Sequence, residues 1–172
     1  AYTFEMGTTF FQDCASFEST IYPDNLQALM YAFKAARLPY QNPAGPRIID
    51  LSITPTTVDP GTLVTLTAIA DDNLYSTNNG REPTQVIKEA RFSIDIPSWS
   101  TGALTYTIDA TDGNLNSTTE SLVVVIDTTN LPAGPHIIFV EAMDNDGNWG
   151  VPSAIILHVT GLIHTYIPLL VR

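Results

Sequence analysis

From residue 47 onward, the chain is a succession of short β-rich runs separated by clusters of turn-forming residues. Thr, Val and Ile dominate these runs, and prolines or Asp-Gly pairs such as Asp112-Gly113 and Asp146-Gly147 separate them. Short strands at this spacing are typical of a β-sandwich. We predict seven strands, at Arg47–Thr54, Thr62–Ala70, Gln85–Asp95, Leu104–Ala110, Glu120–Asp127, His136–Asp144 and Ser153–Thr160.

The fold class that follows is mainly β, with a seven-stranded immunoglobulin-like β-sandwich over residues 47–160. The Cys–Trp–Cys core of antibody domains is missing, so we expect Leu66, Phe92 and Ile138 to occupy the equivalent buried positions. His136 falls where such folds place a structural corner residue, which favours a structural role over metal ligation. Alternation predicts an inner face formed by Val64, Leu66, Ala68 and Ala70 of the second run and Ile138, Val140 and Ala142 of the sixth, with Glu141 pointing outward.

The residues before position 47 have a different pattern. Residues 23–37 are predicted to form one amphipathic helix, with Asp24 as N-cap and Gln27 completing a capping box. Residues 2–6 are predicted to form a short strand, and the turn-rich segment 43–46 a linker between two domains. One strand and one helix cannot bury their apolar faces, so this unit must dock on something else.

This first segment resembles the C-terminal end of a zinc carboxypeptidase catalytic domain, in the secreted bacterial carboxypeptidase T-like branch of the carboxypeptidase A family. The likeness covers about residues 1–42, and the residues that carry it are Tyr2–Glu5, Phe17-Glu18, Pro23–Leu29 and Ala35–Tyr40. The resemblance implies that Glu5 matches the family's catalytic glutamate, the general base toward zinc-bound water.

The same resemblance implies that this chain is inactive by itself. The family holds its zinc with a His-x-x-Glu pair and a distant second His, all upstream of the catalytic glutamate. The histidines of this chain are His136, His158 and His164, and none has a Glu three residues later. We therefore expect no metal ligands and no bound cofactor in this chain, and zinc in the longer enzyme.

A second resemblance concerns the β-rich part. Gly61–Leu66, Ala90–Asp95, Gly134–His136 and Val140–Gly150 look like immunoglobulin-like modules appended to secreted bacterial hydrolases. Such modules imply spacing, stability or surface attachment rather than catalysis. A secreted or cell-surface bacterial location follows from both resemblances.

The net charge of −11 excludes some partners. Residues 47–160 carry fourteen acids and four bases, which sum to −10, whereas residues 1–46 sum to −2 and Arg172 adds +1. Nucleic acids and anionic membranes require a basic surface, so neither is an expected partner. No apolar run reaches the roughly 18 residues of a membrane span. The start lacks a secretory signal, so we expect a piece of a longer protein.

Three features of the β-rich part can carry binding chemistry. The segment Asp144–Asn148 forms either a hairpin turn or, with Asp71-Asp72 or Asp95, a calcium site outside the EF-hand class. The acidic surface serves either to dock a basic partner or to prevent aggregation. The aromatic residues that could form a sugar-binding platform, if they do not serve in packing, are Trp99, Trp149, Tyr75 and Tyr106.

Two further features leave alternatives open. Cys14 is the single cysteine, which fits a small buried side chain, a reduced compartment or a disulfide to a cysteine outside this chain. The apolar tail 161–172 can pack on the sandwich, add a strand or act in sorting. The apolar face of the 24–37 helix can pack against the missing catalytic domain or form a homodimer.

We therefore predict a non-catalytic accessory domain of a secreted zinc metallocarboxypeptidase. The alternative is a binding module, for calcium-stabilised adhesion or for carbohydrate.

Overall fold

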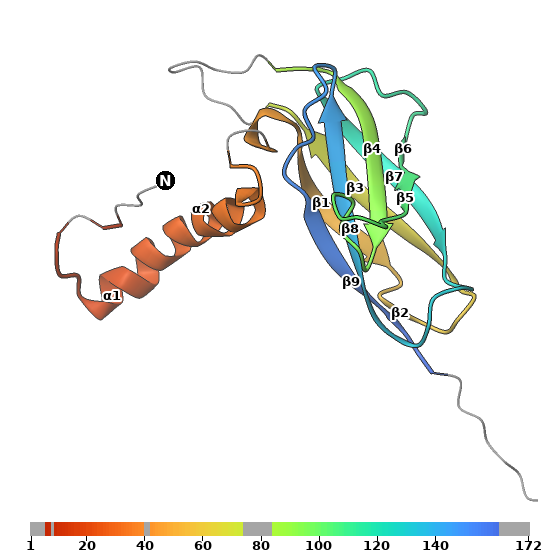
Figure 1. Cartoon of the computed structure of the whole chain (residues 1–172). Helices are drawn as coiled ribbons and strands as arrows, with labels where there is room; N and C mark the ends of the chain where they lie inside the picture. The colour runs from red at the N-terminus through yellow and green to blue at the C-terminus, as the bar shows by residue number, and fades with distance from the viewer. Residues whose placement is uncertain (1–5, 8, 40–41, 74–83, 162–172) are drawn as a thin grey trace, which may run out of the picture.

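The computed structural model describes residues 6–7, 9–39, 42–73 and 84–161, as one helical segment and two β-sheets (Figure 1). The helical segment lies to one side of the sheets, with its C-terminal end nearest to them. Its elements are α1 (Cys14–Ser16), a π-helical turn η1 (Phe17–Ile21), α2 (Tyr22–Ala35) and a 3-10 turn η2 (Asn42–Ala44). The strands are β1 (Arg47–Thr54), β2 (Thr57–Val58), β3 (Leu63–Asp71), β4 (Ile87–Ile94), β5 (Thr105–Thr107), β6 (Asp109–Ala110), β7 (Thr119–Asp127), β8 (Gly134–Asp144) and β9 (Ser153–Val159).

The helix begins earlier than the sequence predicts. Its N-cap is Asp13, whose side chain accepts hydrogen bonds from Ser16 N at 2.8 Å and Ser16 Oγ at 2.7 Å. The prediction of Asp24 as N-cap is wrong, because helical backbone runs through that position without interruption. Pro23 lacks an N–H donor, and the π-helical turn that precedes it places this proline in the first turn of α2.

The described part of the chain is mainly β and consistent with a β-sandwich. The four-stranded sheet has the order β1-β3-β7-β6, and the five-stranded sheet has the order β2-β9-β8-β4-β5. All neighbouring pairs are antiparallel except β2 and β9. One core cluster contains buried side chains of both sheets.

The described residues form nine strands, where the sequence predicts seven. Six predicted runs agree with single strands within two residues at each end. The run 104–110 instead splits, since β5 pairs with β4 of one sheet and β6 with β7 of the other. The strand that the prediction lacks is β2, a two-residue pairing too short to show alternation. The immunoglobulin-like type stays a prediction.

The predicted core is confirmed. Leu66 and Ile138 are completely buried, and Phe92 is 5% exposed. Alternation also holds in β3 and β8, where the residues predicted to face inward are all buried, namely Val64, Ala68, Ala70, Val140 and Ala142. Period-2 patterning of apolar residues therefore identified which face of these strands forms the core.

The segment that precedes β1 is packed against the sandwich at three of its residues. Asn42, Gly45 and Pro46 are buried, and Gly45 lies against the backbone of residues 148–150. The predicted linker is therefore a close-packed junction in the structure, while the division into domains at 43–46 stays a prediction. Among the described residues, no helix is long and apolar enough to cross a membrane.

Candidate functional site

Several predicted site residues lie outside the described residues: Glu5, Tyr75, His164 and the tail 162–172. Within the part of the chain that the structure describes, no three His, Cys, Asp or Glu side chains are grouped so that they could hold a metal ion. His158 is exposed on β9. Cys14 is exposed and unpaired at the start of α1, so the interpretation of Cys14 as a buried side chain is wrong.

His136 has the structural role that the sequence predicts. Its ring is 4% exposed, and its two nitrogens lie 2.7 Å from Asp95 Oδ2 and 2.7 Å from Pro132 O. Burial works against the charged form, but the hydrogen bonds to Pro132 and Asp95 outweigh it and raise the pKa of His136 above its usual value. Both nitrogens are therefore engaged in tying β8 to its neighbouring loops.

The segment Asp144–Asn148 forms a hairpin turn. Gly147 has φ +88°, and Asn148 donates from its backbone N to Asp144 Oδ1 at 2.8 Å and from Nδ2 to Asp144 Oδ2 at 3.0 Å. These Asx-type bonds occupy both carboxylate oxygens of Asp144. Asp95 follows β4 at the end opposite to Asp144, because Ile87 pairs with Asp144 and Ile94 with Ile138. Asp95 therefore does not join this turn.

Among the acids that the structure describes, Asp72 has the most strongly shifted pKa. Burial raises its pKa to about 6, a hydrogen bond from Gln85 N opposes this, and the negative charges of Asp144, Asp71 and Asp146 add to the rise. The charge of Asp72 therefore opposes folding at neutral pH. Because the native pKa exceeds the ordinary value of 3.8, the folded state binds the proton more tightly, and stability falls as the pH rises from about 4 to about 6.

Replacing Asp72 by asparagine should therefore stabilise the protein at pH 7.5, on the order of 1–2 kcal/mol. The amide oxygen can still accept the hydrogen bond from Gln85 N, while the buried charge is removed. At pH 4 the native carboxyl is protonated, so the variant and the natural protein should be equally stable. Urea unfolding at both pH values measures this difference, with the exposed Asp109→Asn as control. Equal effects of Asp72→Asn on stability at both pH values would contradict the raised pKa of Asp72.

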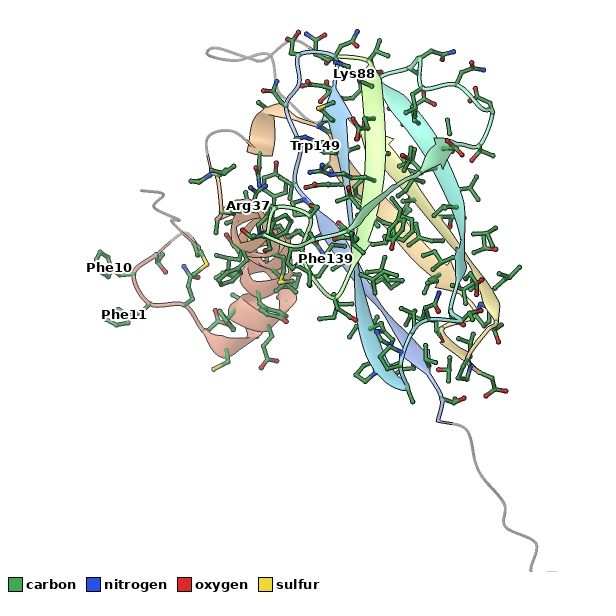
Figure 2. The ribbon with its side chains drawn as sticks, turned by 45° about the vertical axis from the view of Figure 1, so that its right-hand side comes forward. Phe10, Phe11, Arg37, Lys88, Phe139 and Trp149 are labelled. Atoms are coloured by element: carbon green, nitrogen blue, oxygen red, sulfur yellow. The ribbon has the colours of Figure 1, made fainter. Side chains whose placement is uncertain are left out.

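The predicted aromatic platform is realised only in part. Trp99 and Trp149 line one pocket of about 420 Å³, between the end of the helix and the sandwich. Tyr106 is elsewhere, stacked on Phe92 with ring centroids 5.1 Å apart. Figure 2 shows Trp149 and Arg37 on the side of the sandwich that faces the helix.

Each tryptophan of the pocket is held by an arginine. The guanidinium carbon of Arg37 lies 4.5 Å from the ring centroid of Trp99, and that of Arg91 lies 3.6 Å from the ring centroid of Trp149. Trp99 also meets Phe139 edge-on, with centroids 6.0 Å apart. These contacts fix the orientation of both rings.

Glu141 forms part of the pocket and is buried, where the sequence predicts an outward position. It lies on the outer face of β8, but the loop that follows β4 covers it, and Ser98 Oγ donates to its Oε1. Arg91 is its cross-strand partner and donates from Nε at 2.8 Å and from Nη2 at 2.6 Å to the same oxygen. The alternation of β8 thus predicts correctly on which face of the strand Glu141 lies, but it cannot predict that a loop covers this face.

Sequence reasoning missed the polar residues of this pocket, namely Arg37, Asn42, Arg91 and Glu141. For Arg91 and Glu141 a signal exists, because opposite charges meet in register once β4 and β8 are paired. Arg37 and Asn42 offer no such signal, since they belong to the helix end and η2.

No protein-family model matches the chain, and no curated protein matches it in sequence. Solved structures show distant similarity. The alkylpurine DNA glycosylase AlkC of Pseudomonas fluorescens is 14% identical, with a TM-score of 0.43 over 86% of this chain and 42% of the glycosylase. The PKD domain of an M14-like peptidase from a Thermoplasmatales archaeon is 17% identical, with a TM-score of 0.39 over 68% of this chain and 97% of that domain. An endo-β-1,4-mannanase from Thermotoga petrophila is 12% identical, with a TM-score of 0.42 over 91% of this chain and 30% of the mannanase. The chain thus spans less than half of the glycosylase and of the mannanase, and similarity at this level assigns neither a family nor an activity.

Proposed function

We propose that residues 47–160 are an immunoglobulin-like, non-catalytic accessory domain of a secreted zinc metallocarboxypeptidase, and that residues 1–42 are the C-terminal end of its catalytic domain. The observation that carries the proposal is the two-sided character of α2. One side contacts the sandwich, and the other side presents an apolar stripe whose two end residues, Tyr22 and Phe33, are exposed.

The sandwich side of α2 is partly polar. Gln27, Tyr31 and Lys34 recur at helical spacing and line a shared pocket with Ile48 and Val151 of the sandwich. Lys34 Nζ donates to Ser153 Oγ at 3.0 Å. Met30 lines the same pocket, so this side fixes the helix to the edge of the sandwich through both polar and apolar contacts, while Phe33 does not line it.

The opposite side of α2 is apolar. Tyr22, Leu26, Leu29 and Phe33 recur at i, i+4, i+7 and i+11, which places them along one stripe. Tyr22 is 52% exposed and Phe33 76% exposed. A contiguous apolar stripe of this kind marks an interaction surface, and the family resemblance of residues 1–42 supports a catalytic domain as its cover.

The segment before the helix supports the same proposal. Phe10 and Phe11 are almost completely exposed, and Figure 2 shows both side chains pointing away from the rest of the chain. Two adjacent exposed phenylalanines leave a large apolar area in water, which supports a contact surface for the catalytic domain in this segment.

The test is a longer chain that includes the residues upstream of Ala1. It should bind zinc and remove C-terminal residues from peptides, whereas the present chain should do neither. In the longer chain, Glu5→Gln should lower the rate at least about 100-fold with unchanged zinc content, because a general base contributes about that much. The control is Glu18→Gln, an exposed acid of η1. A longer chain without zinc and without activity would refute the proposal, as would activity of the present chain alone.

Sedimentation of the present chain separates this proposal from the homodimer alternative. If the chain sediments as a monomer at all concentrations, this agrees with a catalytic domain of the same polypeptide that packs on the stripe. A stable dimer abolished by Phe33→Asp would assign the stripe to a second copy.

A further inference from the structure

Two side chains that line the pocket between the helix end and the sandwich each carry a polar atom without a partner among the described residues. Glu141 is 2% exposed, and its Oε2 makes no hydrogen bond to any described residue, although Oε1 accepts three. Asn42 is 1% exposed, and its Nδ2 likewise lacks an acceptor among the described residues, although Oδ1 lies 3.4 Å from Arg37 Nη2. Buried polar side-chain atoms nearly always have partners, so this pair leaves an unmet hydrogen-bonding requirement beside the pocket.

The two unpartnered atoms have complementary requirements. The carboxylate oxygen Oε2 of Glu141 needs a donor, and the amide Nδ2 of Asn42 needs an acceptor. A hydroxyl group can serve as either, and a polyhydroxylated molecule presents several hydroxyls within a small frame. The pocket volume of about 420 Å³ lies in the range of small-ligand sites and suits one or two sugar rings.

The pocket contains charges of both signs, because the Glu141 carboxylate lies beside Arg37 and Arg91. Arg37 and Arg91 repel a cation, and the Glu141 carboxylate repels an anion at the place where the unpartnered acceptor lies. The acidic chain as a whole, with net charge −11, further disfavours polyanions. A neutral ligand avoids both repulsions.

The aromatic residues favour a ligand with apolar C–H faces. Trp99 and Trp149 line the same pocket, each oriented by its arginine, so the rings lose little freedom when a ligand packs against them. Trp99 keeps 39% of its surface exposed. A pyranose combines C–H faces for such rings with hydroxyls for Glu141 and Asn42.

We propose that this pocket binds a neutral sugar, as a monosaccharide or as one or two units of a neutral polysaccharide. The helix end supplies Arg37 and Asn42, and the sandwich supplies the two tryptophans and Glu141. Such a site would let the accessory domain attach to a glycan surface, and it does not depend on the zinc carboxypeptidase proposal.

The test is calorimetric titration of the present chain with glucose, mannose, galactose, N-acetylglucosamine and their β-1,4-linked disaccharides, with tryptophan fluorescence as a second readout. We expect one of these probes to saturate one site per chain and to shift the tryptophan emission. Trp99→Ala and Glu141→Gln should each weaken binding at least about tenfold, because the pocket then loses a stacking face or a charged acceptor. Tyr106→Ala, which removes an exposed aromatic outside the pocket, should leave the affinity unchanged.

Trp99 lies in a surface loop, so Trp99→Ala should fold normally. This variant keeps the test decisive if Glu141→Gln is unstable. Absence of saturable binding for every probe would overturn the proposal. If sugar binding survives both substitutions, the sugar binds elsewhere and the assignment of this pocket as the binding site is refuted. Saturation by a neutral glycine-serine peptide, with no response to sugars, would overturn the ligand class.

Discussion

Replacement of Arg91 by methionine should lower the free energy of unfolding by about 3 kcal/mol. Arg91 is the cation that compensates Glu141, whose side chain is only 3% exposed, and it donates two hydrogen bonds to the same carboxylate oxygen. Without this arginine, a carboxylate stays buried with Ser98 as its remaining described donor. Methionine keeps much of the apolar stem volume, so the loss measures the uncompensated charge and the lost contact with Trp149.

The second ion pair on the sandwich supplies a matched control. Arg47 pairs with Asp71 at 3.0 Å, but the Arg47 side chain is 34% exposed, and Asp71 also accepts hydrogen bonds from Asn73 and Thr119. Arg47→Met should therefore cost only about 1 kcal/mol, because the carboxylate keeps other donors and water. Urea unfolding of both variants at pH 7 measures the difference.

A double variant tests the cause. Arg91→Met combined with Glu141→Leu removes the buried charge together with its partner, and most of the lost stability should return. If the double variant is as unstable as Arg91→Met alone, packing rather than charge governs this site, and the interpretation given for Glu141 is wrong.

The strands and their inner faces were predictable because each half-buried strand carries its own alternation. Val64, Leu66, Ala68 and Ala70 repeat every second residue, and nothing outside β3 is needed to assign their face. The run 104–110 lacks this property, since its two ends belong to different sheets and buried Ile108 lies at the crossover. Only the tertiary pairing separates β5 from β6.

The start of the helix was mispredicted for a local reason. Pro23 and Asp24 resemble a helix beginning, because proline in the first turn and an acid near the N-terminus are both favourable. The structure satisfies these preferences inside a longer helical segment, where a π-helical turn precedes the proline and Asp13 is the true cap. Two competing N-terminal signals in one segment cannot be ranked from the sequence alone.

The candidate site was the least predictable part. Trp99 and Trp149 were recognised as possible sugar contacts, but their convergence depends on a loop after β4, a turn after β8 and the end of α2. These three segments are far apart in sequence, and no periodicity links them. The burial of Glu141 has the same origin, because the loop bearing Ser98 covers a face that alternation assigns to solvent.

The junction that holds these segments together should be very sensitive at Gly150. A Cβ at this position would lie 1.6 Å from the carbonyl oxygen of Pro46 and 2.4 Å from its carbonyl carbon. The backbone of Gly150 cannot withdraw freely, since its N donates to Ala142 O at 2.9 Å. Gly150→Ala should therefore destabilise the protein by about 3 kcal/mol, because the contact between residue 46 and the turn must separate.

Gly147 in the same turn is the matched control. Nothing lies within 4 Å of a Cβ built there, but its φ of +88° strains any side chain, so Gly147→Ala should cost only about 1 kcal/mol. Thermal unfolding gives both values, and the tryptophan emission should change for Gly150→Ala alone, because displacement of residue 46 carries the adjoining helix end, with Arg37, away from Trp99. Equal losses of stability, or an unchanged emission in Gly150→Ala, would show that the junction tolerates separation and that the helix is held to the sandwich by other contacts.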